Sequence, residues 1–97
     1  NKMYDAFVCF NDSTAFGVYK AAYKLGLLVG KDISVVGFDN TSYSDFVPPG
    51  LTTIDVDKKL WAKEVVKNYL GLKDGSIENA EVKIPASLIK RGSIKYR

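Results

Sequence analysis

Residues 33–38 read Ile33-Ser34-Val35-Val36-Gly37-Phe38, and the acidic and amide pair Asp39-Asn40 follows them directly. A short apolar run that is rich in β-branched residues and bounded by polar ones is typical of a strand buried on both faces, as in a parallel sheet. A second run of this kind lies upstream in residues 5–10, Asp5-Ala6-Phe7-Val8-Cys9-Phe10. We therefore predict two buried strands.

The residues between these runs predict a helix. Residues 11–14, Asn11-Asp12-Ser13-Thr14, carry side chains that cap helix starts, because their oxygens accept hydrogen bonds from free backbone N–H groups. Gly26 suits the left-handed conformation that ends many helices. Between them the apolar residues recur at steps of three and four: Ala15, Val18, Tyr19, Ala22 and Leu25. Strand, helix and strand in succession make a βαβ unit, so we predict an α/β fold with a parallel sheet.

Beyond the second strand the sequence alternates between loop and helix signals. Residues 41–50 have the Ser, Asp, Pro and Gly content of a loop, and residues 51–54 are a short β-prone segment. Residues 57–72 then show a helical stripe that is expected to face the core, through Leu60, Trp61, Val65, Tyr69 and Leu72. Residues 81–84 and 87–90 alternate polar with apolar, as half-exposed edge strands or an extended tail do.

Composition limits the classes of function. The chain has 97 residues with no histidine, so catalytic triads and metal sites that use histidine are excluded. Cys9 is the only cysteine and lies in an apolar run, which predicts a buried thiol and neither a disulfide nor a metal cluster. Asp55 and Asp57 flank Val56 at a predicted helix start, where acidic residues complement the helix dipole. The glycines lack nucleotide-binding spacing. We therefore expect no catalytic residue, no metal, no cofactor and no enzyme.

Charge and hydropathy point to a soluble chain. No apolar run approaches the ~20 residues that a membrane helix needs, and the polar start at residues 1–5 does not resemble a signal peptide. The net charge of +3 is spread along the chain, apart from the final stretch at residues 90–97. A nucleic-acid-binding module concentrates its basic residues on one face. We therefore interpret residues 90–97 as a solvated end, and we expect neither a membrane partner nor direct DNA contact.

Asn11 and Asp39 mark a candidate ligand site. Ligands of open α/β sheets bind at the carboxyl ends of the parallel strands. Asn11 ends the first predicted strand and Asp39 ends the second, so a βαβ unit brings both to one edge of the sheet. A carboxylate accepts from two hydroxyls and an amide both donates and accepts, which suits a polyhydroxylated ligand such as a sugar. The alternative is that both side chains only cap the segments that follow.

Four motifs in this order resemble the lactose and galactose repressor family. They are the Asn-Asp helix start in residues 10–17, the stretch 32–40, the proline-rich loop and Leu-Thr-Thr in residues 48–54, and the closing segment 85–91. The resemblance covers nearly the whole chain. It implies that residues 1–97 are part of an effector-binding and dimerisation domain, the C-terminal subdomain of a periplasmic-binding-protein-like (type I) fold. The family's N-terminal subdomain and DNA-binding helix-turn-helix have no counterpart in this sequence.

The same resemblance implies roles for individual residues. Asn11 and Asp39 match positions where the family contacts the hydroxyls of sugars or other effectors, whereas Val56 stands where many relatives carry a ligand-contacting glutamine. The family also dimerises partly through the helix after the Asn-Asp motif and the loop before the prolines. Here those positions are Phe16, Val18, Tyr19, Tyr23, Tyr43, Phe46 and Val47. The alternative for these seven residues is packing within their own subunit.

The favoured interpretation is therefore a segment of a cytoplasmic, homodimeric repressor, in which a small effector, a sugar or sugar derivative, controls operator affinity. DNA would be bound only through a domain outside these residues. The alternative is a sugar-binding protein of a transport system, which shares the fold. A third class, a metabolic α/β enzyme, would need a catalytic group at the edge formed by Asn11 and Asp39.

Overall fold

The computed structural model describes residues 4–96, so residues 1–3 of the polar start and residue 97 of the basic tail lie outside it. The chain divides into two compact units. The first unit is the chain up to Asp55 together with the segment from Ser87 onward, and the second unit is Val56–Ala86. No linker signal in the sequence marks this division.

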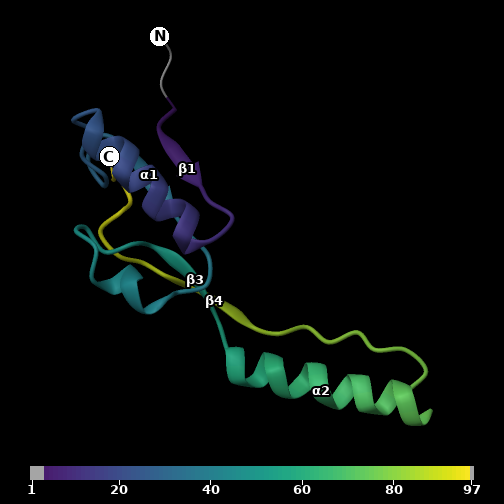
Figure 1. The fold of residues 1–97 in the computed structure, drawn as a ribbon. Helices are drawn as coiled ribbons and strands as arrows, with labels where there is room; N and C mark the ends of the chain where they lie inside the picture. Colours follow the sequence, from purple (N-terminus) through teal and green to yellow (C-terminus); the bar gives the residue numbers. More distant parts are fainter. Residues whose placement is uncertain (1–3, 97) are drawn as a thin grey trace. The chain divides into compact units, whose positions relative to one another are not determined.

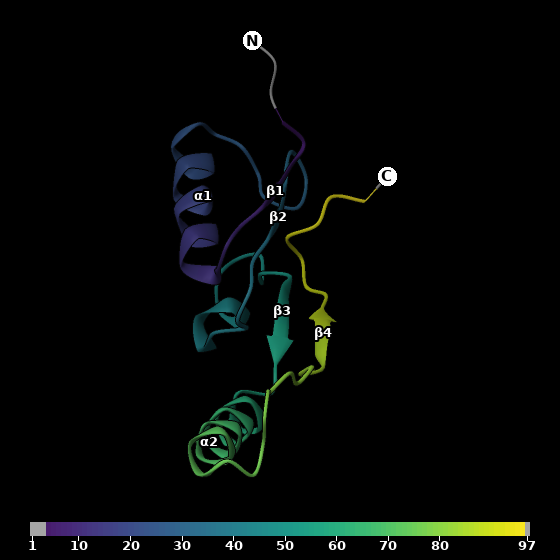
Figure 2. The same cartoon turned by 90° about the vertical axis from the view of Figure 1, so that its right-hand side faces the viewer.

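The first unit is built on the βαβ arrangement that the sequence predicts. Strand β1 (Ala6–Val8), helix α1 (Asp12–Lys24) and strand β2 (Ser34–Val36) follow one another along the chain (β1 and α1 in Figure 1, β2 in Figure 2). β1 and β2 pair in parallel, with Phe7 opposite Val35. Both strands are shorter than the runs that predict them.

Helix α1 begins and ends where its capping residues place it. Asn11 is the N-cap. At the other end Gly26 has φ +72° and donates to the carbonyl of Tyr23 at 3.1 Å, while the N–H of Leu27 reaches the carbonyl of Ala22 at 2.9 Å. This pair of bonds is a Schellman motif, which satisfies the last carbonyls of the helix.

The core of the first unit lies between α1 and β2, and it consists of Ala15, Ala22, Ile33, Val35 and Leu51. Cys9 packs against this core, and burial raises the pKa of its thiol. The prediction that the first strand is buried on both faces is wrong, since Val8 keeps 85% of its side chain exposed. The reason is that, in the described part of the chain, β1 pairs only with β2 and is contacted by α1, so the face that carries Val8 has no cover.

Two further strands complete the first unit. β3 (Thr53–Val56) begins two residues later than the β-prone segment predicts, and Thr52 just before it forms a parallel bridge with Val36 of β2. β4 (Ala86–Ile89) pairs with β3, and the two arrows run in opposite directions (Figure 2). The predicted loop holds the short 3-10 helix η1 (Ser42–Asp45). Residues 81–84 form no strand.

The second unit consists of helix α2 (Lys58–Asp74) and the extended segment after it. Asp57 caps α2, since its Oδ1 accepts from the N–H of Leu60 at 3.0 Å, and Gly75 ends it with φ +83°. The predicted core position of Trp61 is wrong, because 47% of that side chain is exposed. The other large members of the stripe, Val65, Tyr69 and Leu72, are exposed as well. Residues 76–85 bring too few apolar side chains to cover this helix within the unit.

The basic tail is not a solvated end, contrary to the sequence interpretation. Ser93 is fully buried, and its hydroxyl donates to the carbonyl of Val35 at 2.6 Å and accepts from the N–H of Thr52 at 2.8 Å. The N–H of Val35 returns a bond of 2.9 Å to the carbonyl of Ser93. The tail therefore joins β2 to the start of β3, a role that its basic composition does not reveal.

We expect Ser93→Ala to lower the free energy of unfolding by about 2 kcal/mol, because a buried N–H and a buried carbonyl lose their shared partner. Ser87→Ala, at an exposed position of β4, is the matched control and should change stability by less than about 0.5 kcal/mol. Urea denaturation of the protein that carries this chain measures both. Equal effects of the two changes would contradict the buried position of the tail.

Candidate functional site

The carboxyl ends of β1 and β2 lie side by side, as the sequence predicts. The N–H of Cys9 donates to the carbonyl of Val36 at 2.8 Å, and the N–H of Asp12 donates to the carbonyl of Phe38 at 3.0 Å. Asn11 precedes Asp12 and Asp39 follows Phe38. The structure thus brings the two candidate ligand residues to one edge of the sheet.

Asn11 caps α1, which is the structural role that the sequence left open for it. Its side-chain oxygen accepts from the N–H of Thr14 at 2.8 Å, and its side chain is half-buried. This bond uses the oxygen of the amide and leaves its two N–H groups for other acceptors. Capping and ligand contact are therefore compatible at Asn11.

Asp39 lies on an unusual turn of the backbone. It has φ +111° and Asn40 has φ +49°, in the region that favours glycine but that Asp and Asn tolerate better than other residues. The N–H of Asp39 donates to the carbonyl of Ile54 at 2.9 Å, and the N–H of Asn40 donates to Oγ1 of Thr53 at 3.2 Å. These bonds to β3 therefore hold the backbone conformation of the turn at Asp39 and Asn40.

Asp12 is a central residue that sequence reasoning treated only as a cap. Its side chain is fully buried and accepts three hydrogen bonds. Oδ1 accepts from Oγ1 of Thr53 at 2.7 Å, while Oδ2 accepts from the N–H of Thr41 at 2.8 Å and from its hydroxyl at 3.3 Å. Asp12 therefore connects α1 to β3 and to the turn that carries Asp39. The sequence did hold a signal for this second role. Asn11 and Asp12 are both capping residue types, and because one helix start needs only one cap, the other side chain is available for a different contact.

Gly37 leaves the room that the carboxylate of Asp12 occupies. A Cβ atom at position 37 would collide with Oδ1 of Asp12 and approach Cδ2 of Leu51 to 2.9 Å. The absence of a side chain at the end of β2 is therefore a condition for the buried carboxylate.

Arg91 is the second residue that the sequence analysis missed, because it lies in the tail that was interpreted as solvated. Its guanidinium donates to Oδ1 of Asn40 at 2.9 Å and to the carbonyl of Leu51 at 2.9 Å. Asn40 in turn donates from Nδ2 to Oδ1 of Asp55 at 3.2 Å. Asp55 thus takes part in this network, whereas its neighbour Asp57 is the cap of α2.

The seven predicted interface residues fall into two groups. Tyr23, Tyr43 and Phe46 expose 85%, 69% and 76% of their side chains. The other four pack against the core of the first unit: Phe16, Val18, Tyr19 and Val47. The hydroxyl of Tyr19 donates to the carbonyl of Pro49 at 2.7 Å, and burial raises its pKa to about 12. Packing within the subunit therefore explains why the last four residues are apolar. It does not explain the three exposed aromatic residues Tyr23, Tyr43 and Phe46.

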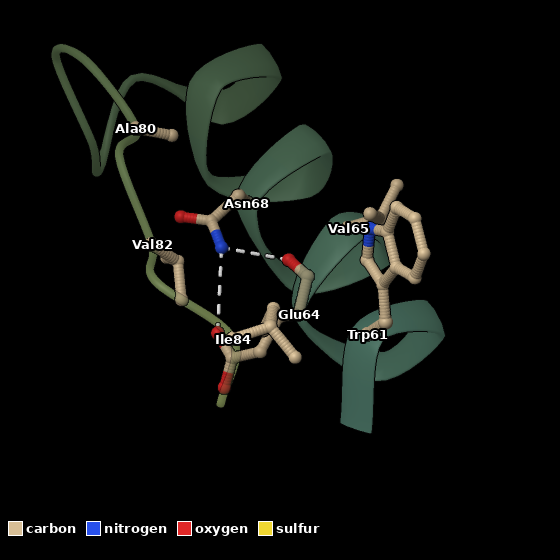
Figure 3. A pocket seen from close by; sticks show the side chains of 7 residues that line it. All are labelled: Trp61, Glu64, Val65, Asn68, Ala80, Val82 and Ile84. Atoms are coloured by element: carbon tan, nitrogen blue, oxygen red, sulfur yellow. Dashed lines mark hydrogen bonds between the residues drawn. The ribbon is translucent and has the colours of Figure 1, made fainter. Parts of the chain in front are cut away.

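The second unit holds a pocket of about 180 Å³ between α2 and the extended segment (Figure 3). Trp61, Val65, Val82 and Ile84 give it apolar walls. Its polar side chains bond within α2, since Nδ2 of Asn68 donates to the carbonyl of Glu64 at 2.7 Å. The volume lies below the range of about 300–1,000 Å³ that is typical of small-molecule sites. The edge at Asn11 and Asp39 is therefore the better candidate site.

The described residues were also compared with the requirements of a metal site and of a membrane-spanning helix. Residues 4–96 contain no cluster of three or more acidic or cysteine side chains that could hold a metal ion. Neither of the helices in this part of the chain is long and apolar enough to cross a membrane.

Comparison with known proteins gives a consistent result. The family model described as periplasmic binding protein-like domain matches residues 2–94. The lactose operon repressor of Escherichia coli (strain K12) is 41% identical over 86 residues, which are 89% of this chain and 24% of that protein. The transcriptional repressor PurR of Pasteurella multocida (strain Pm70) is 38% identical over 93 residues, 95% of this chain and 28% of its own length.

A solved structure agrees with these sequences. The crystal structure of the lac repressor dimer bound to operator and the anti-inducer ONPF matches with a TM-score of 0.85 and 38% identity, over 95% of this chain and 32% of that one. This match confirms the predicted α/β, periplasmic-binding-protein-like fold. The chain spans about a quarter of the length of the curated relatives it matches.

We expect Asp12→Asn to lower the free energy of unfolding by about 2 kcal/mol, because either orientation of the amide loses a bond. An NH₂ group in place of Oδ2 would face the N–H of Thr41, and one in place of Oδ1 would take the acceptor from the hydroxyl of Thr53. Asp32→Asn is the matched control, since the Asp32 carboxylate also accepts from a backbone N–H, that of Leu28 at 2.7 Å, but in an exposed position. It should cost less than about 1 kcal/mol. Thermal unfolding of both variants measures these losses of stability. Equal losses in Asp12→Asn and Asp32→Asn would contradict the central role of Asp12.

Proposed function

Because the chain belongs to the periplasmic binding protein-like domain family, as part of the effector-binding domain of lactose/galactose-type repressors, we propose that it senses a sugar and thereby controls operator binding. Repressors of this family are cytoplasmic transcription factors and not enzymes. The relatives named above are transcriptional repressors, which favours this function over that of a sugar-binding protein in a transport system.

The observation that carries the proposal is the shared edge of Asn11 and Asp39. One side chain offers N–H donors and the other offers carboxylate acceptors, so together they match the alternating donors and acceptors of a sugar. The turn at Asp39 is held to β3 by the bond from its N–H to the carbonyl of Ile54 and by the bond from the N–H of Asn40 to the hydroxyl of Thr53. A preorganised site of this kind loses less entropy on binding than one that must first be ordered.

The effector class is the part of the proposal that the relatives leave open, because they include both a lactose repressor and PurR. A sugar is favoured by the carboxylate of Asp39, which can accept from two neighbouring hydroxyls at once. Binding would favour one arrangement of the sensor and shift operator affinity through the difference between its states. DNA contact itself belongs to a domain outside these residues.

The proposal includes a homodimer that uses α1 and the loop before the prolines. The lac repressor in the matched structure is a dimer. Tyr23, Tyr43 and Phe46 are aromatic and exposed, and such residues are enriched in the cores of interfaces. Phe16, Val18, Tyr19 and Val47 would support this surface from below, where they pack against the core.

We expect the complete polypeptide that carries this chain to bind at least one member of a panel of pentoses, hexoses and sugar phosphates in a calorimetric titration. Asp39→Asn removes the carboxylate while keeping its shape, and should weaken that binding by about tenfold or more. Asp5→Asn is the matched control, because the Asp5 side chain is 83% exposed at the opposite end of β1. It should bind like the wild type.

Purines are titrated in the same experiment. Binding of a purine and of no sugar would overturn the effector class but keep the sensor. Absence of binding to every compound, or binding that ignores Asp39, would overturn the assignment of this edge as the effector site.

We expect Phe46→Ser to weaken the homodimer of the complete polypeptide by about tenfold, since large side chains near the centre of an interface include the few whose truncation costs about 2 kcal/mol or more. Sedimentation velocity over a dilution series measures the dimer constant. Leu25→Ser is the control, because Leu25 is also apolar and 74% exposed but lies outside the proposed surface. An unchanged dimer constant in Phe46→Ser would remove the loop from the interface.

A further inference from the structure

Arg91 joins the tail of the chain to three positions within residues 40–51 through one side chain. Its Nη1 donates to the carbonyl of Leu51 at 2.9 Å and to Oγ of Ser44 at 3.0 Å, while its Nη2 donates to Oδ1 of Asn40 at 2.9 Å. The side chain is only 18% exposed. Arginine suits this task because its planar guanidinium presents five donors in a fixed fork, whereas lysine presents a single nitrogen.

The bond from Arg91 fixes the orientation of the Asn40 amide. The oxygen of that amide faces the guanidinium, and its nitrogen donates to Oδ1 of Asp55 at 3.2 Å. A cation on one side and a carboxylate on the other leave one favourable orientation for the amide. Asn40 therefore stays in the left-handed conformation with φ +49°, directly after Asp39.

The backbone of Arg91 is held independently of its side chain. Its N–H donates to Oγ1 of Thr52 at 2.9 Å, and the neighbouring Ser93 is anchored to β2. Gly50 leaves space for the aliphatic stem, since a Cβ atom there would approach Cδ of Arg91 to 3.0 Å. Shortening or replacing the guanidinium should therefore leave the tail in place and change only what the side chain holds.

The ion pair of Arg91 does not account for its position. Nε lies 3.5 Å from Oδ1 of Asp45, but that carboxylate is 78% exposed. Exposed pairs contribute little to stability because solvent screens them. The partly buried, charge-assisted bonds to Asn40 and Leu51 are the stronger contacts.

We propose that Arg91 is a positioning residue of the effector site, which holds the Asp39–Asn40 turn in its binding conformation through the side chain of Asn40. The proposal rests on the proposed function at Asp39, and it adds a contribution from a segment that lies far from the turn along the chain. The effector would not touch Arg91. Its guanidinium would act by reducing the number of conformations that the turn samples before binding.

The first test needs no effector. Hydrogen exchange followed by NMR reports on the amide of Asp39, which donates to Ile54, in the wild-type polypeptide and in Arg91→Lys. We expect exchange of this amide to become about tenfold faster, while the amide of Val35, bonded to Ser93, stays unchanged. Lys90→Met, an exposed neighbour, is the control and should change neither amide. Unchanged exchange at Asp39 in Arg91→Lys would overturn the proposal.

The second test separates positioning from general stability. In calorimetric titrations with the sugar that binds best, Arg91→Lys should weaken binding by about tenfold at temperatures far below its unfolding transition. Asn40→Gly, which permits the same backbone conformation without the side chain, should weaken it similarly. The double variant should bind no worse than Asn40→Gly alone, because Arg91 acts through that side chain. Wild-type affinity in Arg91→Lys, or losses that simply add, would overturn the proposal.

The two tests distinguish failure of this inference from failure of the proposed function. If the wild type binds no sugar while Arg91→Lys accelerates exchange at Asp39, the proposed effector is wrong and the control of the turn by Arg91 stands. If the wild type binds a sugar and Arg91→Lys changes neither affinity nor exchange, the proposed function stands and the role of Arg91 is wrong.

Discussion

The buried carboxylate of Asp12 is the interaction on which the first unit depends. A carboxylate without solvent is costly unless hydrogen bonds replace its water. Here Thr41 and Thr53 supply them, and all the described residues show no buried side-chain polar atom left without a partner. Because the two threonines come from different segments, satisfying one carboxylate fixes the start of α1, the turn after β2 and the strand β3 with respect to one another.

The candidate site inherits its geometry from this arrangement. Asn11 is the residue before Asp12, and Asp39 lies two residues before Thr41, so both are placed by the same carboxylate. Arg91 holds the turn from its other side through Asn40. In the proposed site, capping uses only the oxygen of the Asn11 amide and leaves its N–H groups for a ligand. The backbone turn, held by the bond from the N–H of Asp39 to Ile54, sets where the carboxylate of Asp39 lies.

The same elements carry the proposed dimer surface. α1 follows the ligand candidate Asn11, which is its N-cap, and bears Tyr23 near its end, while the loop after Asp39 bears Tyr43 and Phe46. In the proposed repressor, a shift of either element on effector binding would reach the dimer surface directly. The bonds between Asp12 and Thr41 tie the two elements, so they would move together and not one by one. Coupling between the effector site and the dimer surface would need only that the effector binds one arrangement of the domain more tightly than another. It would not need a chain of contacts through the core.

Local sequence determined the βαβ unit, its helix caps and the edge that holds Asn11 and Asp39, because periodicity and capping act between residues close in the chain. Only the tertiary structure decided the roles of Asp12, Ser93 and Arg91, whose partners lie up to 58 residues away, between Ser93 and Val35. It also decided that Val8 and Trp61 are exposed, since burial depends on which elements come to cover a face. The residues next to a serine or an arginine in a basic tail do not reveal which distant backbone or side-chain group it will hydrogen-bond.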